Sequence, residues 1–221
     1  MLATFTNRLG GVSKGAYASL NLGDHVDDSP SDVMANRKIV QDLHGPIQFM
    51  NQVHGNRIAV IEGITPDAPT ADALITGIPG ITLAVMVADC IPLLLISREV
   101  VAAVHVGRRG LVNEVALKTL QLMREMGAGD ISAKIGPAIC GRCYEVSSEI
   151  YDEVVSHHPL ARSQTSSGTP ALDLSKALSG VLLSAGIKTV LDQNFCTLED
   201  QNFFSYRRDG VTGRQAGLVS L

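Results

Sequence analysis

The sequence predicts one domain of the mixed α/β (α+β) class, with a mixed central sheet that helices flank. The chain has 221 residues, 45% of them hydrophobic and 18% charged, which is the composition of a globular protein with a full core. Several apolar runs are short and nearly continuous, as in buried strands. Helical patterns interleave with these runs without a regular βαβ repeat, so the sheet is expected to be mixed.

The amino-terminal part is predicted to begin with a loop and a helix. Residues 10–28 are rich in Gly, Ser, Asn and Asp, which favour turns. Residues 31–43 place Val, Ile and Leu near helical spacing and predict a helix. Two strands are expected next, over residues 47–53 and 57–61, around a turn at residues 54–56.

The middle of the chain is predicted to supply three buried strands. Residues 81–87, 92–96 and 100–106 are nearly continuous apolar runs, and a break at residues 88–91 separates the first two. A helix is expected over residues 111–126.

The last third is predicted to be mainly helical. A short strand is expected over residues 132–135, and helices over 145–156 and 175–185. Residues 158–170 contain Ser, Thr, Gly and Pro throughout and predict a mobile loop.

Charge and hydropathy exclude several classes of function. Lys and Arg number 18 against 22 Asp and Glu, for a net charge of −4, so the chain lacks the basic surface of a nucleic-acid-binding protein. The most hydrophobic stretch, residues 81–96, is too short to cross a bilayer. The first residues do not resemble a signal peptide, and the four cysteines are interpreted as thiols. We therefore expect a cytoplasmic protein that binds neither nucleic acid nor membrane.

Two histidines and one cysteine lie at the ends of expected strands. His54, Cys90 and His105 each stand beside a glycine or a turn, where functional groups reach the rim of a sheet. Together they would form a three-ligand zinc site with an open fourth position. The residues alone favour an alternative, in which Cys90 and His105 belong to the core and His54 is a turn residue.

Sequence blocks along nearly the whole chain occur in an order that a known family shares. These blocks are TNRLGGVSKG (6–15), YASLNLGDHV (17–26), QVHG (52–55), ADAL (71–74), ADCIP (88–92), AVH (103–105), IGPAI (135–139), FFSYRRDG (203–210) and TGRQ (212–215). On these blocks the chain resembles the polyphenol-oxidase-like, or laccase-domain, family. The resemblance implies a zinc-dependent purine nucleoside phosphorylase with adenosine deaminase activity, and residues 1–221 as one catalytic domain. Its implied partners are phosphate and purine nucleosides, namely adenosine, inosine, guanosine and methylthioadenosine.

The resemblance also implies the metal ligands. In the family the metal is held by residues that match His54, Cys90 and His105, so the two lines of reasoning agree on a zinc site. Copper, which the name laccase suggests, is the less favoured metal, because a multicopper oxidase needs more ligands than the six histidines allow.

Arginines and an asparagine in the blocks are expected to bind substrate. Arg8, Asn21, Arg207 and Arg208 are the candidates, because the planar guanidinium suits phosphate and the surrounding loops allow close approach. For each, a structural role in a surface loop or turn is the alternative.

Asp89 and Arg109 are the expected catalytic residues. Asp89 precedes Cys90 and would orient a water or carry a proton, with a turn-capping role as the alternative. Arg109 keeps an arginine of the family, whereas Arg108 replaces the family's Trp and is predicted to add a charge beside the metal. A stacking partner for the substrate would then be lost or replaced by the guanidinium.

The remaining cysteines and two other classes of function stay open. Cys140 and Cys143 form a C-x-x-C that we expect near the cavity, without a redox role, and Cys196 is expected to be buried. A thiol hydrolase with Cys90 as nucleophile would have a similar sequence. So would a non-catalytic binding domain that retained the fold.

Overall fold

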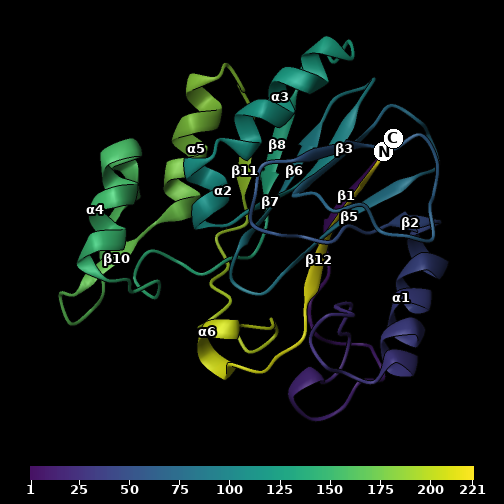
Figure 1. Cartoon of the computed structure of the whole chain (residues 1–221), viewed down its shortest axis with the longest axis horizontal. Helices are drawn as coiled ribbons and strands as arrows, with labels where there is room; N and C mark the ends of the chain where they lie inside the picture. Colours follow the sequence, from purple (N-terminus) through teal and green to yellow (C-terminus); the bar gives the residue numbers. More distant parts are fainter.

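Two β-sheets form the centre of the molecule in a computed structural model that describes residues 1–221 (Figure 1). The larger is a mixed sheet with the strand order β11 (Val190–Asp192), β8 (Ser132–Ile135), β6 (Ile91–Ile96), β7 (Val101–Val106), β4 (Ala73–Thr76) and β3 (Ile58–Val60). The smaller has the order β1 (Leu2–Phe5), β12 (Gln215–Ser220), β5 (Thr82–Val87) and β2 (Ile47–Gln48). Each sheet combines antiparallel and parallel pairs.

Helices lie on both outer sides of the paired sheets (Figure 1). On the side of the larger sheet are α2 (Arg108–Val112), α3 (Val115–Glu125), α4 (Ser148–His157) and α5 (Leu174–Ser184). On the side of the smaller sheet is α1 (Pro30–His44). The short elements are η1 (Gly15–Tyr17), η2 (Pro159–Ala161), β9 (Arg162–Gln164), β10 (Pro170–Leu172) and α6 (Tyr206–Asp209). No helix combines the length and the apolar character needed to cross a bilayer.

The alternation of side chains along the strands divides the core into three layers. Leu93 of β6 packs beneath the helices in a cluster of 27 buried residues. The next residue, Leu94, points to the other face and joins 13 buried residues between the two sheets, with Leu83 of β5 among them. Ala84 of β5 packs toward α1 in a third cluster of nine residues. Both sheets are therefore buried on both faces, which explains the nearly continuous apolar runs.

The predicted mixed α/β class is confirmed, and the structure adds a second sheet to the central one that was expected. The strands expected over 81–87, 92–96 and 100–106 are β5, β6 and β7. The second sheet depends on β12, which pairs with β1 and β5. Such pairings between distant segments are not specified by local sequence patterns.

Three local predictions were wrong. The helix expected over 111–126 is two helices, because Glu114 has a left-handed backbone with φ of 61° and turns the chain between α2 and α3. The strand expected over 47–53 is limited to the two residues of β2. Residues 158–170 do not form a free loop, since they contain η2 and most of an antiparallel hairpin of β9 with β10.

Candidate active site and metal centre

His54, Cys90 and His105 meet at one end of the space between the two sheets. Cys90 directly precedes β6, and the antiparallel register pairs Pro92 of β6 with His105 of β7, so Cys90 and His105 lie at the same end of the hairpin. His54 comes from the loop between β2 and β3. The ligand atoms of the three residues lie within 4.8 Å of one another. The structure thus brings together the three residues that the sequence predicted as a metal site.

The geometry of this group suits a metal ion. Sγ of Cys90 lies 3.8 Å from Nε2 of His54, and the ring centroids of His54 and His105 are 4.7 Å apart at an interplanar angle of 78°. All three residues line one cavity. Two imidazoles and a thiolate that leave a position open toward a cavity are a donor set typical of catalytic zinc.

Asp72 organises the group from the buried side. The β4–β7 register places it opposite His105, whose Nδ1 lies 2.8 Å from Oδ1 of Asp72. Because a carboxylate only accepts hydrogen bonds, Nδ1 of His105 donates and Nε2 is left free for a metal. Burial would raise the pKa of Asp72, but hydrogen bonds from His105 and from the N–H groups of Gly55 and Val53 lower it below its ordinary value.

The same carboxylate holds the backbone of His54 in an unusual conformation. His54 has φ of 59°, in the left-handed region that residues with a Cβ seldom adopt. Its N–H donates to Oδ1 of Asp72 at 2.9 Å, and the N–H of Gly55 donates to Oδ2 at 2.7 Å. Successive N–H groups that converge on an anion stabilise such a turn. Asp72 therefore positions two of the three candidate ligands.

Cys90 and His105 form a thiolate–imidazolium pair in the metal-free protein. Burial disfavours the thiolate, but the charge and hydrogen bond of His105, with a hydrogen bond from His54, lower the pKa of Cys90 to about 6. Burial also disfavours the imidazolium, but Cys90 and Asp72 raise the pKa of His105 to about 9. At neutral pH a metal at this site would therefore displace the proton of His105.

We expect Cys90 to be the most reactive cysteine of the metal-free protein. Since its pKa is about 6, its alkylation by iodoacetamide should slow as the pH falls through about 6 and level off above neutrality. Cys143 and Cys196 should react slowly at pH 7, because burial raises the pKa of both thiols. Peptide mapping by mass spectrometry after brief exposure measures each rate. Zinc should protect Cys90, and a Cys90 rate that is flat from about pH 5 to 7 would contradict the ion pair.

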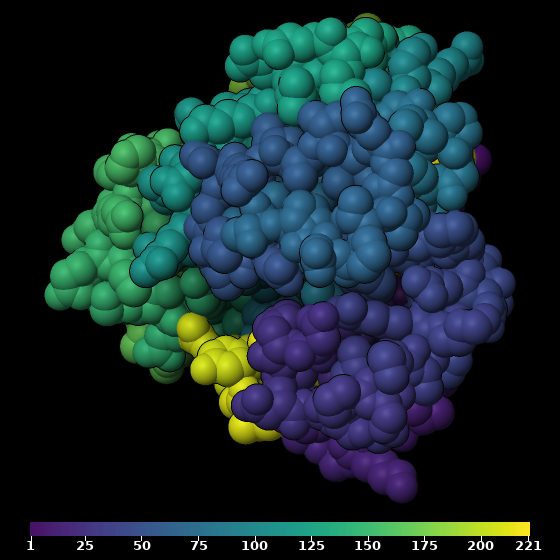
Figure 2. Space-filling model, turned by 45° about the vertical axis from the view of Figure 1, so that its right-hand side comes forward, coloured from purple at the N-terminus to yellow at the C-terminus, as the bar shows by residue number.

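A cavity of about 440 Å³ opens next to these ligands, a size that suits a small-molecule substrate. Its polar lining comes from distant parts of the chain, with His25 from the amino-terminal loop, Tyr144 from the middle, and Tyr206, Arg207 and Arg214 from the end. In Figure 2 the amino-terminal segment (purple), the segment near residue 60 (blue) and the carboxy-terminal segment (yellow) border a hollow. The site is therefore assembled by tertiary structure.

Asp89 and Arg207 lie in the cavity wall, as the sequence predicted for site residues. Asp89 accepts a hydrogen bond from the hydroxyl of Thr197 on Oδ1 and one from the N–H of Arg207 on Oδ2, both at 2.6 Å. The guanidinium of Arg207 donates to the carbonyl of Glu145 at 2.8 Å and lies over the ring of Tyr144. Asp89 thus anchors the start of α6 and also faces the cavity.

The structure does not bring Arg8 or Arg109 to the cavity. Nε of Arg8 donates to the carbonyl of Ala18 at 2.7 Å, and its guanidinium lies over the ring of Phe204. Arg109 is exposed on α2 and is absent from the cavity lining. Their expected roles in phosphate binding and catalysis therefore have no support in their positions.

Asn21 and Arg208 also lie outside the cavity lining, where they hold loops in place. Arg208 donates from Nη1 to the carbonyl of Thr197 and from Nη2 to that of Phe203, both at 2.8 Å. Asn21 is fully buried, and its Oδ1 accepts the N–H of Arg214 at 2.8 Å. Both residues support the site through other residues, which is the structural alternative given for them above.

Sequence reasoning missed Asp72 and Arg214. Both stand in blocks on which the family resemblance depends, ADAL and TGRQ, and this was the available signal. Nη1 of Arg214 donates to the carbonyls of Thr212 and Gly213 at 3.0 Å. Burial lowers the pKa of Arg214, although the charges of Cys90 and Asp89 oppose the shift. A half-buried arginine facing the cavity is suited to an anionic substrate group.

Arg108, which was predicted to add a charge beside the metal, does not line the cavity that contains the metal-ligating group. Its Nη1 donates to Oε2 of Glu153 on α4 at 3.1 Å, and it is absent from the cavity lining. Helix α2 starts at this residue, and the charge of Arg108 opposes the rise that burial causes in the pKa of Tyr144, which lines the cavity. Tyr144 supplies an aromatic wall to the cavity instead.

Comparison with known proteins defines the class of this protein. Residues 2–221 match the family described as multi-copper polyphenol oxidoreductase laccase, and the chain belongs to this laccase-like family. A protein of Corynebacterium glutamicum named purine nucleoside phosphorylase is 42% identical over 228 residues, which cover 98% of this chain and 93% of that protein. A protein of the same name from Streptomyces coelicolor is 44% identical over 227 residues, with 98% and 94% covered. The family inferred from the sequence blocks is confirmed.

Solved structures share the fold over its full extent. A Neisseria meningitidis protein has a TM-score of 0.89 at 38% identity, covering 99% of this chain and 93% of that one. YlmD from Geobacillus stearothermophilus also has a TM-score of 0.89, at 33% identity, with 99% and 91% covered.

Proposed function

We propose that this protein is a zinc-dependent purine nucleoside phosphorylase whose catalytic domain is residues 1–221. The observation that carries the proposal is the group of His54, Cys90 and His105 at the wall of a cavity that also contains two arginines. The names of the related proteins support the reaction class. Zinc is favoured over copper because the site has one thiolate and two imidazoles, whereas a multicopper centre needs many more histidines.

Arg207 and Arg214 are the proposed phosphate ligands. In phosphorolysis, an oxygen of orthophosphate forms a bond to C1′ of the ribose, and the bond from C1′ to the purine nitrogen breaks. The purine leaves with the electron pair and takes up a proton. The two guanidinium groups would hold the phosphate dianion and direct it at C1′. When bound, zinc would act as a Lewis acid toward the purine and activate water for deamination.

Asp89 is the proposed proton carrier. Asp89 lines the cavity, and each of its oxygens accepts one hydrogen bond, from Thr197 or from the N–H of Arg207, and retains a further lone pair. Adenosine deamination, which needs a proton carrier beside activated water, is proposed as a second activity of this site. Adenosine, inosine, guanosine and methylthioadenosine are the proposed nucleosides. Asn21 takes part by positioning Arg214 through the backbone.

The function is tested by metal analysis and turnover of the wild type and His105→Ala. The wild type is expected to convert inosine to hypoxanthine only with phosphate, and His105→Ala to lose one zinc per chain together with this activity. Ammonia released from adenosine without phosphate reports deamination. Zinc without turnover would favour a non-catalytic binding domain, and turnover without any metal would favour thiol chemistry at Cys90.

Arg214→Gln is expected to raise the KM for phosphate by about 10- to 100-fold, because a charge-assisted hydrogen bond contributes about 1.5–3 kcal/mol. The zinc content should not change, since Arg214 is not part of the metal-ligating group. Initial rates at varied phosphate, with inosine saturating, measure the effect. Arg98→Gln is the matched control, because Arg98 is exposed in the turn between β6 and β7. Equal phosphate KM values for the two variants would remove Arg214 from the proposal.

A further inference from the structure

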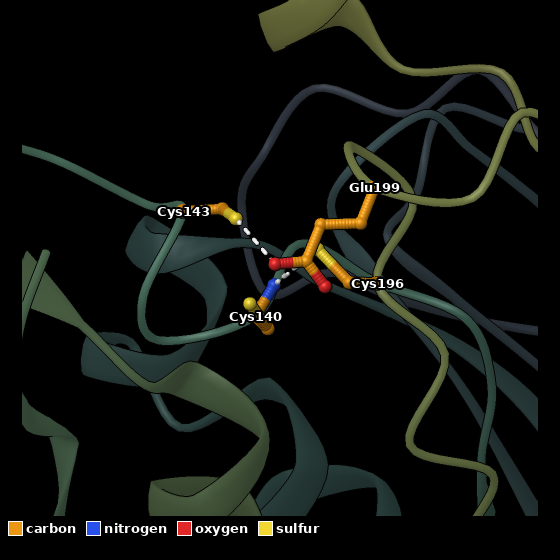
Figure 3. A group of neighbouring side chains, drawn as sticks. All are labelled: Cys140, Cys143, Cys196 and Glu199. Atoms are coloured by element: carbon orange, nitrogen blue, oxygen red, sulfur yellow. Dashed lines mark hydrogen bonds between the residues drawn. The ribbon is translucent and has the colours of Figure 1, made fainter. Parts of the chain in front are cut away.

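A second group of metal-ligating side chains lies outside the cavity. Cys140, Cys143, Cys196 and Glu199 place their ligand atoms within 4.8 Å of one another. Figure 3 shows the carboxylate of Glu199 between the cysteines, with the side chains turned toward one another. All three thiols are free, and none of the four residues lines the cavity of the candidate active site. The C-x-x-C expected to lie near the cavity is therefore part of a separate cluster.

The cluster joins two segments that are far apart in the sequence. Cys140 and Cys143 lie in a turn between β8 and α4, which the N–H of Cys143 closes on the carbonyl of Cys140 at 3.0 Å. Cys196 and Glu199 follow β11. The N–H of Cys140 points at Sγ of Cys196 at 3.4 Å, and Ala138 forms a parallel bridge with Cys196. Backbone contacts thus fix the relative positions of the two segments.

We propose that these four side chains bind a second zinc ion in a structural site. Three thiolates and one carboxylate supply four protein ligands, the number found in closed structural zinc sites, and the C-x-x-C spacing is typical of them. Zn–S bonds of about 2.3 Å put two sulfurs about 3.8 Å apart around one tetrahedral ion. The separations within the cluster do not exceed 4.8 Å, so a contraction of about 1 Å at most completes the geometry.

The chemistry of the donors selects the ion. Three soft thiolates favour zinc over calcium or magnesium, which take oxygen ligands. Without a cation, the Cys143 thiol donates to Oε1 of Glu199 at 3.4 Å. Zinc would displace the thiol protons to solvent and take both the sulfur and the carboxylate as ligands.

The position of the cluster gives the second ion a role in holding the cavity wall. Tyr144 directly follows Cys143 and lines the cavity. Thr197 directly follows Cys196 and donates to Asp89 at 2.6 Å. An ion that ties the two segments together would hold Tyr144 directly and Asp89 through Thr197. The proposal does not depend on the proposed function, because the two groups share no residue and can be removed separately.

Cobalt titration of the metal-free wild type and of two variants tests the proposal. Thiolate-to-cobalt charge-transfer absorption scales with the number of bound thiolates, and the cluster offers three against one at the cavity. Two equivalents of cobalt are expected to bind. In the double variant Cys140→Ser/Cys143→Ser this absorption should fall to about one quarter, and in Cys90→Ser to about three quarters. Circular dichroism checks that both variants are folded.

Zinc analysis and thiol counting complete the test. The wild type should hold two zinc ions per chain, and each variant one. A wild type with a single zinc that Cys140→Ser/Cys143→Ser retains and Cys90→Ser loses would overturn the proposal. All four thiols of the wild type should react in denaturant with chelator and without reductant. Two missing thiols would show a disulfide in the cluster and overturn it as well.

Discussion

Asp72→Asn is expected to lower the zinc affinity of the His54, Cys90 and His105 group by about 10- to 100-fold or more. The Asn side chain has two possible orientations. Its NH2 group either donates to Nδ1 of His105 and forces the ring proton onto Nε2, or it faces the N–H groups of Gly55 and Val53, which in the wild type donate to a carboxylate oxygen and would then meet a second donor. In the first case Nε2 is blocked for a metal. In the second, the left-handed turn at His54 loses its anion. Both outcomes remove a ligand.

Competition with a chelator of known affinity measures this loss for Asp72→Asn. Asp67→Asn is the matched control, since Asp67 is exposed in the loop before β4. Urea unfolding with and without zinc separates a local loss of affinity from a general loss of stability. Nitrogen NMR shifts of the His105 ring report which nitrogen carries the proton. Wild-type affinity with the wild-type tautomer would contradict the role given to Asp72.

Gly107→Ala is expected to reduce zinc affinity by at least about tenfold through steric contact alone, because metal–ligand distances tolerate only about 0.2 Å of change. A Cβ at this position would lie 3.0 Å from Sγ of Cys90 and 3.2 Å from Cδ2 of His54. Both contacts are closer than ordinary van der Waals separation, so the two ligands must move apart by a few tenths of an ångström. The backbone of Gly107 itself is extended, with φ of −84°, so the effect is not one of backbone strain.

Gly63→Ala is the control for this variant, because a Cβ there meets no atom within 4 Å. Both variants should bind cobalt at the cysteine cluster normally. Cobalt binding at the cavity should weaken only in Gly107→Ala, with a shift of its visible bands as the ligand geometry changes. Identical cobalt spectra and affinities for the two glycine variants would show that the site adapts to the added methyl group.

Part of this site could be predicted from the sequence because two of its ligands lie on one hairpin. The apolar runs define β6 and β7, and their antiparallel register brings Cys90 and His105 to the same end. The residues alone favoured core or turn roles for His54, Cys90 and His105, and the family resemblance was needed to choose the metal site for all three. The position of His54 also depends on Asp72, which holds its backbone. Asp72 is buried, and only its place in the ADAL block distinguished it in the sequence. Its importance lies in four hydrogen bonds that only the folded chain makes.

The arginines could not be sorted from the sequence alone. Arg207 and Arg208 are neighbours with the same chemistry, and each donates to backbone carbonyls, yet only Arg207 lines the cavity. The two side chains leave α6 in different directions. This helix has only four residues, and the N–H of Arg207 in its first turn donates to Asp89. A local pattern does not fix such a direction. The missed Arg214 likewise depends on the pairing of β12 with β5.

The pairing of β12 between β1 and β5 has a consequence for biosynthesis. Residues 215–220 emerge from the ribosome after every other strand, so until then β5 has one bare edge and the nascent chain has no completed smaller sheet. The thiol of Cys90 and both imidazoles are already present at that stage, but Arg214 and α6 are not. A growing chain therefore carries the three candidate metal ligands before the cavity beside them is complete. The cavity would be completed only after β12 has paired with β1 and β5, and until then the bare β5 edge is where a chaperone would find an unprotected strand.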